Sequence, residues 1–290
     1  MASEDGTGTR PADYRIAVMP TVTVAGQSIH YESDGHEGPT TIFVHGFRNS
    51  STSWAPVRAR LDNSRLHAWY LDLPGCGRSS TPPTWEECTI EAYAAAVHGF
   101  CTSLGLTDAV LVGHSLGGGI ALTVALRHPE LLRGLILVAP TPAEGLVYLR
   151  EEQLQALIHP SDEELTALAR AAFHRIPGDT EFERLLGTVR AARIEHVEGA
   201  IRSQREFSVV DRLGDIETPT LVVGGDRDGH IPIRYTLRTA AAIRRCRVQI
   251  YHNVGHAPFV EVPDDFAALL ERFVLTELPL RTLEQAGKLR

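Results

Sequence analysis

The chain has 290 residues, of which 43% are hydrophobic and 22% charged, the balance of an ordinary globular protein and not of a disordered or fibrous chain. Its formal net charge of −8 argues against nucleic acid as a partner, because a nucleic-acid-binding protein concentrates positive charge on its surface. The four cysteines are scattered and form no C-x-x-C pair, so the spacing of a zinc or redox motif is excluded.

Residues 1–15 are polar and lack the apolar segment of a secretory signal, so we expect them to form a disordered leader. No apolar run reaches the roughly 18 residues that a membrane-spanning helix needs. We therefore expect a cytoplasmic protein with no membrane partner.

After the leader, strand and helix patterns alternate along the chain. Two strands within 21–35 meet at a turn, and TTIFV and LHAWYLDL are further strands with long apolar runs. Helices are expected over 53–61 and over 89–104, where apolar residues recur on one face.

The middle of the chain contains the most apolar strands. DAVLVGHS runs directly into the helix LGGGIALTVALRHP, and LRGLILVAP follows as a strand. Continuous apolar runs suit strands that are buried on both faces. The alternation predicts an α/β protein with a mostly parallel central sheet flanked by helices.

Residues 141–215 interrupt this alternation. Separate helices are expected near 149–158, 161–175, 180–195 and 197–210, and Ser161 with Glu164 forms a capping box for the second of them. The strand pattern resumes at 219–225 and ends with a closing helix over 263–276. We therefore predict a core made of residues 16–140 and 216–290, with 141–215 inserted as a helical unit.

The pentapeptide Gly113-His114-Ser115-Leu116-Gly117 matches G-x-S-x-G and lies between a strand and a helix. The two glycines leave room for a strained turn that exposes the Ser115 hydroxyl at the sheet edge. The N-terminus of the following helix stabilises negative charge beside the serine. We interpret Ser115 as a nucleophile and His114 as a packing residue that points away from it; a glycine-rich turn with an incidental serine is the alternative.

Candidates for a base and an acid follow the last two strands. His256, one of thirteen histidines, stands in G-H-A-P after the last strand, and Asp226 and Asp228 follow LVVGG. The order Ser, Asp, His along the chain fits the motif around Ser115. His256 would take the Ser115 proton, and the aspartate would hold the imidazole in the required tautomer.

Together these motifs resemble the α/β-hydrolase fold superfamily over residues 21–276. The segment G-D-R-D-G-H-I-P is similar to the family pattern G-x-x-D-x-x-x-P, which points to Asp228 as the acid. Asp226 is the rival and would pair with a nearby arginine. Glu144 stands at a position that other members use for the acid.

The resemblance also implies an oxyanion hole. His45-Gly46-Phe47 resembles the oxyanion loop of the superfamily, so the backbone N–H groups of Phe47 and Leu116 would donate to the tetrahedral oxygen. His45, Arg48 and Trp54 are candidate residues of the substrate pocket. A solvated arginine and a packed tryptophan are the alternatives for the last two.

The segment D-L-P-G-C-G-R-S at 72–79 resembles a loop of members that carry a helical cap, and 141–215 resembles that cap. We expect Asp72 to shape the loop. Cys76 is the cysteine most open to reaction there, although a space-filling role is favoured. A cap covers the nucleophile and excludes water. The aromatic residues expected in it indicate an apolar pocket and are Tyr148, Phe173, Phe182 and Phe207.

The resemblance implies a hydrolase that cleaves a carboxylic ester, thioester or lactone of a small apolar molecule through an acyl-Ser115 intermediate. Such a triad needs no metal or organic cofactor, and the expected partner is a small-molecule substrate. Serine at position 115 disfavours the dehalogenases and epoxide hydrolases of this fold, which carry Asp there. Acyl transfer or cyclisation, carbon–carbon cleavage, lyase chemistry and a slow receptor-like binding protein stay open, as does the oligomeric state.

Overall fold

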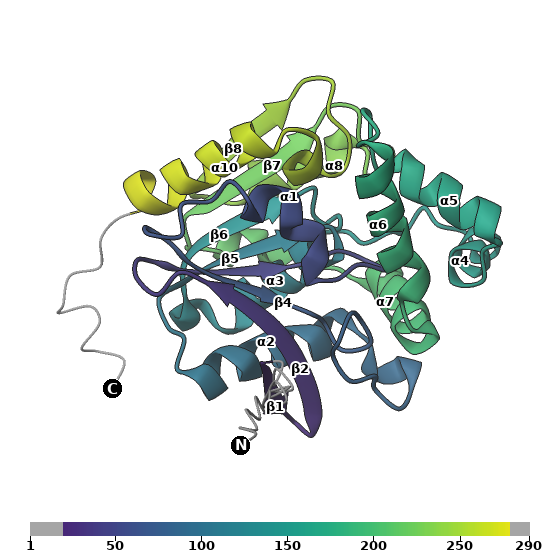
Figure 1. Cartoon of the computed structure of the whole chain (residues 1–290), viewed down its shortest axis with the longest axis horizontal. Coiled ribbons are helices and arrows are strands. Elements are labelled where there is room, and N and C mark those ends of the chain that lie inside the picture. Colours follow the sequence, from purple (N-terminus) through teal and green to yellow (C-terminus); the bar gives the residue numbers. More distant parts are fainter. Residues whose placement is uncertain (1–19, 279–290) are drawn as a thin grey trace, which may run out of the picture.

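The computed structural model describes residues 20–278, so the predicted leader at 1–15 lies outside the described residues. An eight-stranded sheet crosses the centre of the molecule in the order β1-β2-β4-β3-β5-β6-β7-β8 (Figure 1). The pairs β1–β2 and β2–β4 are antiparallel, and the others are parallel. The predicted α/β class with a mostly parallel sheet is confirmed. The strands are β1 (Thr21–Val24), β2 (Gln27–Asp34), β3 (Thr40–Val44), β4 (His67–Leu71), β5 (Ala109–His114), β6 (Leu132–Val138), β7 (Thr220–Gly225) and β8 (Cys246–Tyr251).

Helices cover both faces of the sheet centre. They are α1 (Ala55–Arg58), α2 (Ile90–Leu104), α3 (Leu116–Arg127), α4 (Glu151–Ile158), α5 (Asp162–Ala171), α6 (Asp179–Ala191), α7 (Ile194–Glu206), α8 (Ile233–Ala242), α9 (Pro258–Glu261) and α10 (Pro263–Arg272). Leu111 of β5 belongs to a core cluster with residues of α2 and α3, whereas Val110 and Val112 belong to a cluster with residues of α1, α9 and α10. Because side chains alternate along a strand, each face meets its own helical layer, which explains the continuous apolar runs.

The parallel strands bring distant segments to one edge of the sheet. The turn at His45 follows β3, and Ser115 follows β5. Asp228 comes shortly after β7, and His256 comes shortly after β8. Since parallel strands end at the same edge, residues far apart in sequence meet there.

Between β6 and β7 the described chain contains α4 to α7 and a 3-10 turn (Val210–Asp215), without a strand. Helix α4 packs on α7 and α5 on α6, while α7 also contacts α2 and α3. Helices α4 to α7 lie together at the right of Figure 1. The N–H of Glu164 donates to Ser161 Oγ over 3.2 Å, and the N–H of Ser161 donates to Glu164 Oε2 over 2.7 Å, so the predicted capping box is confirmed. The division into core and cap stays a prediction.

Several element boundaries differ from the predicted ones. Within the insertion, α5 ends at Ala171 and not at 175, α6 ends at Ala191 and not at 195, and α7 spans Ile194–Glu206 in place of 197–210. The predicted helix over 53–61 is a 3-10 turn (Ser51–Trp54) followed by the single turn of α1. The closing helix α10 ends at Arg272 and continues as a π-helical turn (Phe273–Glu277), and the short α9 was not predicted. Shorter 3-10 turns lie at Trp85–Glu87 and Pro129–Leu131. None of the helices within residues 20–278 has the length and apolar character needed to cross a membrane.

Candidate active site

Ser115 lies in a strained turn between β5 and α3. Its φ of 52° and ψ of −114° form a conformation that L residues rarely adopt. The turn is held by hydrogen bonds, because Ser115 N–H donates to Val138 O over 3.0 Å and Gly118 N–H donates to Ser115 O over 2.8 Å. A Cβ on Gly117 would lie 2.3 Å from Val44 O, so this position requires glycine. The packing around β3 and β5 therefore holds the strained conformation of Ser115.

Asp228 and His256 form a buried hydrogen-bonded pair. His256 Nδ1 donates to Asp228 Oδ2 over 2.7 Å, and their side chains are 5% and 1% exposed. Because Nδ1 carries the hydrogen, Nε2 is the unprotonated nitrogen of the neutral ring. This is the tautomer that a general base for a serine needs.

The environment of Asp228 keeps its carboxylate ionised. The backbone N–H groups of His230 and Ile231 each donate to Oδ1 over 2.8 Å. Burial raises the pKa of Asp228, but the charge and hydrogen bond of His256 and these two N–H groups outweigh burial and lower the pKa below its usual value. Asp228 is therefore a fixed negative charge behind His256.

The two rival acids have other partners. Asp226 Oδ2 accepts from His252 Nδ1 over 2.6 Å and Oδ1 accepts from Asn253 N–H over 2.7 Å, with an arginine at 3.9 Å. Glu144 pairs with an exposed arginine, Arg238, over 3.0 Å. The geometry therefore favours Asp228 as the partner of His256, and its catalytic role stays a prediction.

The predicted oxyanion loop passes directly beside the serine. A Cβ on Gly46 would lie 3.2 Å from Ser115 Cβ and 2.9 Å from His114 Nδ1, so only glycine permits this close approach. Phe47 follows Gly46, and Leu116 opens helix α3, where backbone N–H groups have no partner within the helix. The arrangement is compatible with Phe47 and Leu116 as donors, and that role stays a prediction.

Ser115 and His256 both line a cavity of about 290 Å³. Each of α4 to α7 contributes to it, with Leu157, Leu168, Leu185 and Ile201 among their residues. Its polar residues are Arg48, Asn49, Ser53, His114, Ser115, Tyr148, Gln204, His230 and His256. Among the described residues no aspartate or glutamate lines it. The cavity is thus apolar apart from its serine, histidines, arginine and a few neutral polar groups.

Of the predicted pocket residues, only Arg48 lines this cavity. His45 is fully buried, where Nδ1 donates to Gly46 O over 2.8 Å and Nε2 accepts from the N–H of Leu73 over 3.0 Å. Trp54 is also fully buried and packs between aromatic rings of Phe43 and Phe259. The interpretation of His45 and Trp54 as pocket residues is therefore corrected: both lie behind the wall, and the packed tryptophan was the right alternative.

Of the four aromatic residues predicted in the insertion, two line the cavity and two pack elsewhere. Tyr148 and Phe173 line the cavity. Phe182 packs with Ala169 in a small cluster, and Phe207 belongs to the main core.

Two histidines next to His256 were not predicted as part of the site. His114 Nε2 donates to the backbone O of His256 over 3.1 Å, and His230 Nε2 donates to Leu168 O over 3.0 Å. Burial lowers the pKa of His114 well below its usual value and lowers that of His230 to about 4, with the neighbouring His256 as a further cause. Both rings are therefore neutral near pH 7. Their positions beside Ser115 and Asp228 in the motifs were the available signal.

The loop after β4 is structural, as expected. Asp72 Oδ1 accepts from the N–H of Ser51 over 2.7 Å and Oδ2 accepts from the N–H of Arg78 over 2.9 Å, which fixes the loop. Cys76 in this loop is 2% exposed, and burial raises the pKa of its thiol well above the usual value. The thiol is therefore protonated and fills space.

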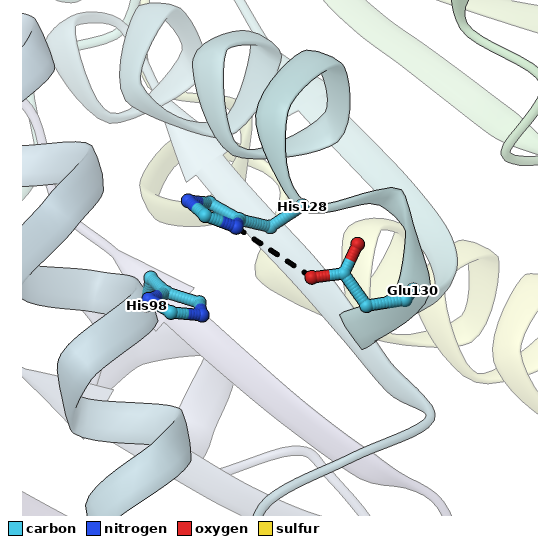
Figure 2. A group of neighbouring side chains, drawn as sticks. All are labelled: His98, His128 and Glu130. Atoms are coloured by element: carbon cyan, nitrogen blue, oxygen red, sulfur yellow. Dashed lines mark ion pairs between the residues drawn. The ribbon is translucent and has the colours of Figure 1, made fainter. Parts of the chain in front are cut away.

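One group among the described residues has the side chains and closeness to hold a metal ion, and it lies outside the cavity. It consists of His98 on α2, His128 at the end of α3, and Glu130 (Figure 2), with candidate ligand atoms within 4.8 Å of one another. The two rings stack at 3.8 Å with planes 12° apart. Lone pairs in stacked rings point in parallel and do not converge on one ion, so the group as it stands is a ring stack with an ion pair between His128 and Glu130 at 3.5 Å.

Comparison with known proteins agrees with the fold. A solved esterase from Exiguobacterium antarcticum superposes with a TM-score of 0.81 over 87% of this chain and 97% of its own, at 22% identity, which shows the fold alone. The structure described as Est816, an N-acyl homoserine lactone degrading enzyme, has a TM-score of 0.78 at 26% identity and covers 88% of this chain and 100% of its own. The monoacylglycerol lipase abhd6-A of Xenopus laevis is 26% identical over 268 residues, which is 84% of this chain and 78% of the lipase.

The family model described as alpha/beta hydrolase fold matches residues 39–263, well over half of the chain. The relatives that resemble the chain include esterases and other hydrolases. The predicted resemblance is confirmed, and the protein belongs to the alpha/beta hydrolase fold family.

Proposed function

We propose that this protein is a serine hydrolase that cleaves a carboxylic ester, thioester or lactone through an acyl-Ser115 intermediate. The observation that supports this most is the buried Asp228–His256 hydrogen bond of 2.7 Å in the wall of the cavity that also contains Ser115. A general base for a serine requires this tautomer and a nearby serine, whereas a histidine with a structural role requires neither. The similarity to a lipase and to a lactone-degrading enzyme is consistent with the proposal.

The proposed reaction has two halves. In the first, His256 Nε2 takes the Ser115 proton while Oγ attacks the carbonyl carbon, and the N–H groups of Phe47 and Leu116 stabilise the oxyanion. The bond to the leaving group breaks, and His256 returns the proton to the departing alcohol, thiol or lactone oxygen. In the second half, water gives a proton to His256 and attacks the acyl carbon. His256 then returns this proton to Ser115 Oγ as the acyl–oxygen bond breaks, which releases the acid and regenerates Ser115.

The cavity supports a small substrate with an apolar body. Its volume of about 290 Å³ lies at the lower end of ligand pockets, and leucine, isoleucine, valine, alanine and phenylalanine side chains together make up most of the wall. The helices α4 to α7 all contribute to the wall, so their movement would control access to Ser115.

The experiment that tests the nucleophile is intact-mass analysis after treatment with a fluorophosphonate. The wild type is expected to gain one adduct, and Ser115→Ala is expected to gain none. Ser53→Ala is the matched control, because Ser53 lines the same cavity but its hydroxyl donates to Ser50 O over 2.8 Å. The control variant is expected to gain the adduct like the wild type.

A wild type that forms no adduct would contradict an activated Ser115 and favour the receptor-like binding protein instead. If the adduct forms, hydrolysis of p-nitrophenyl esters, thioesters and lactones tests the substrate class. Rapid labelling without hydrolysis of any of them would point to acyl transfer or to another reaction in the same site.

A further inference from the structure

Arg48 is a buried cation in the wall of the proposed active-site cavity. The residue is 6% exposed, and its guanidinium lies 5.6 Å from the ring of Phe47. Nη2 donates to Leu157 O over 2.9 Å and to Ile158 O over 3.2 Å, both at the end of α4. Carbonyl groups at a helix C-terminus carry partial negative charge, so they stabilise the guanidinium in part.

No carboxylate of residues 20–278 neutralises this charge. No aspartate or glutamate in this part of the chain forms an ion pair with Arg48, and its Nε is buried without a hydrogen-bond partner. Buried arginines in proteins are almost always paired, because removing a charge from water is costly. A negatively charged ligand in the cavity would therefore supply the counter-charge that Arg48 lacks.

The other ionisable groups around the cavity do not supply a negative charge. Burial lowers the pKa of His114 and His230 and raises that of Tyr148 to about 12, so these three side chains are neutral near pH 7. The charge of Asp228 is directed at His256 and at two backbone N–H groups. Although burial lowers the pKa of Arg48, a guanidinium stays protonated in proteins. Arg48 is therefore the one permanently charged side chain among the described residues that line the cavity.

We infer that Arg48 binds a carboxylate of the substrate, so that the protein acts on esters of small molecules with an apolar body and one anionic end. This inference rests on the proposed function, because it concerns the substrate of the same cavity. A carboxylate forms charge-assisted hydrogen bonds with a guanidinium, and Nη1 is the nitrogen left to donate to it, because Nη2 already donates to Leu157 O and Ile158 O and Nε is buried. A single negative charge suffices, since Arg48 is the one arginine or lysine among the described residues that line the cavity.

A purely structural role for Arg48 leads to a different expectation. If Arg48 only ties the turn after β3 to α4, its removal weakens the binding of charged and uncharged substrates alike. If it binds a carboxylate, removal weakens the binding of charged substrates selectively. The ratio of the two affinities separates these roles.

The test measures binding to Ser115→Ala, in which an ester stays intact. Isothermal titration calorimetry compares the monomethyl esters of straight dicarboxylic acids, from succinate to suberate, with the dimethyl esters of the same acids. At the chain length that reaches Arg48, the anionic ester is expected to bind roughly 10- to 100-fold more tightly. Adding Arg48→Met is expected to remove this difference, and adding Arg48→Lys is expected to keep part of it because the charge remains.

Arg238→Met is the matched control, since it also removes one positive charge but from a side chain that is 69% exposed and pairs with Glu144. It is expected to leave the difference unchanged. Equal affinities at every chain length, no binding of either ester, or a difference that survives Arg48→Met would overturn the inference. Calorimetry on Ser115→Ala requires no turnover, so the two proposals can fail separately. Carboxylate binding can be absent while fluorophosphonate labelling still supports the nucleophile, and labelling can be absent while Arg48 still binds the carboxylate.

Discussion

His114 Nε2 donates a hydrogen bond to the backbone carbonyl of His256 over 3.1 Å, and the two ring centroids are 4.7 Å apart. The residue before the proposed nucleophile thus holds the loop that carries the proposed base. The imidazole position relative to Ser115 therefore depends on a contact between the ends of β5 and β8, and not on the Asp228 hydrogen bond alone.

His114→Ala is expected to lower kcat for a p-nitrophenyl ester by roughly tenfold, because the loop that carries His256 loses its anchor. His114→Gln is expected to restore part of the rate, since its amide can donate to the same carbonyl. Steady-state kinetics separate this from general destabilisation: the change should fall on kcat with little change in KM. Full kcat in the alanine variant would contradict a positioning role.

Asp228→Asn is expected to lower kcat/KM by roughly 10⁴-fold, because an amide does not stabilise the imidazolium or select the same tautomer. Asp226→Asn is the matched control, and it should change the rate little because Asp226 pairs with His252 at the surface. Both variants are assayed on the same ester after a fold check by circular dichroism. A larger loss in Asp226→Asn would move the acid to that position.

The sheet and the strand-end positions could be predicted because each depends on local constraints. The apolar runs at β5, β6 and β7 indicate strands buried on both faces, and G-x-S-x-G marks a turn that only small neighbours permit. Ser115 and His256 then come together because parallel strands end at one edge of the sheet.

Side-chain directions could not be predicted in the same way. His45 and Trp54 lie on either side of Arg48 in the segment after β3, yet both pack into the protein interior while Arg48 lines the cavity. That choice depends on contacts with Leu73 and Phe259, which are distant in sequence. The insertion posed the same difficulty, because a helical pattern does not say whether Phe173 or Phe182 meets the cavity.

Ser115→Gly is expected to raise the free energy of unfolding by about 1 kcal/mol, because glycine adopts a φ of 52° without strain. This figure is the net effect, since the greater conformational entropy of glycine in the unfolded chain offsets part of the gain. Ser115→Ala retains a Cβ and should show no such gain. Urea denaturation of both variants and the wild type measures the difference. Equal stability of the glycine and alanine variants would mean that the turn stores no strain at this residue.

Gly117→Ala is expected to lower the free energy of unfolding by roughly 1–3 kcal/mol, because the added methyl would overlap the carbonyls of the adjoining β3 turn, 2.3 Å away at Val44 O. Gly187→Ala is the control within α6, where no heavy atom outside the local helix backbone lies within 4 Å of the added carbon. It should raise the free energy of unfolding by roughly 0.5–1 kcal/mol, since alanine favours a helix interior. Opposite shifts in urea midpoint are the expected result, and a tolerated alanine at position 117 would contradict the close approach.

We expect the buried His230 to lower the stability of the protein at acidic pH. Burial and the neighbouring His256 lower its pKa from 6.5 to about 4, so the folded state resists a proton that the unfolded state binds. The free energy of unfolding is therefore unaffected by His230 above pH 6.5. It decreases by about 3 kcal/mol in total as the pH falls toward 4. His230→Asn should remove that share of the loss, whereas His159→Asn, at an exposed position, should not. Urea unfolding at a series of pH values between 7 and 4 measures the slopes, and an unchanged slope in His230→Asn would show that folding does not lower the pKa of this histidine.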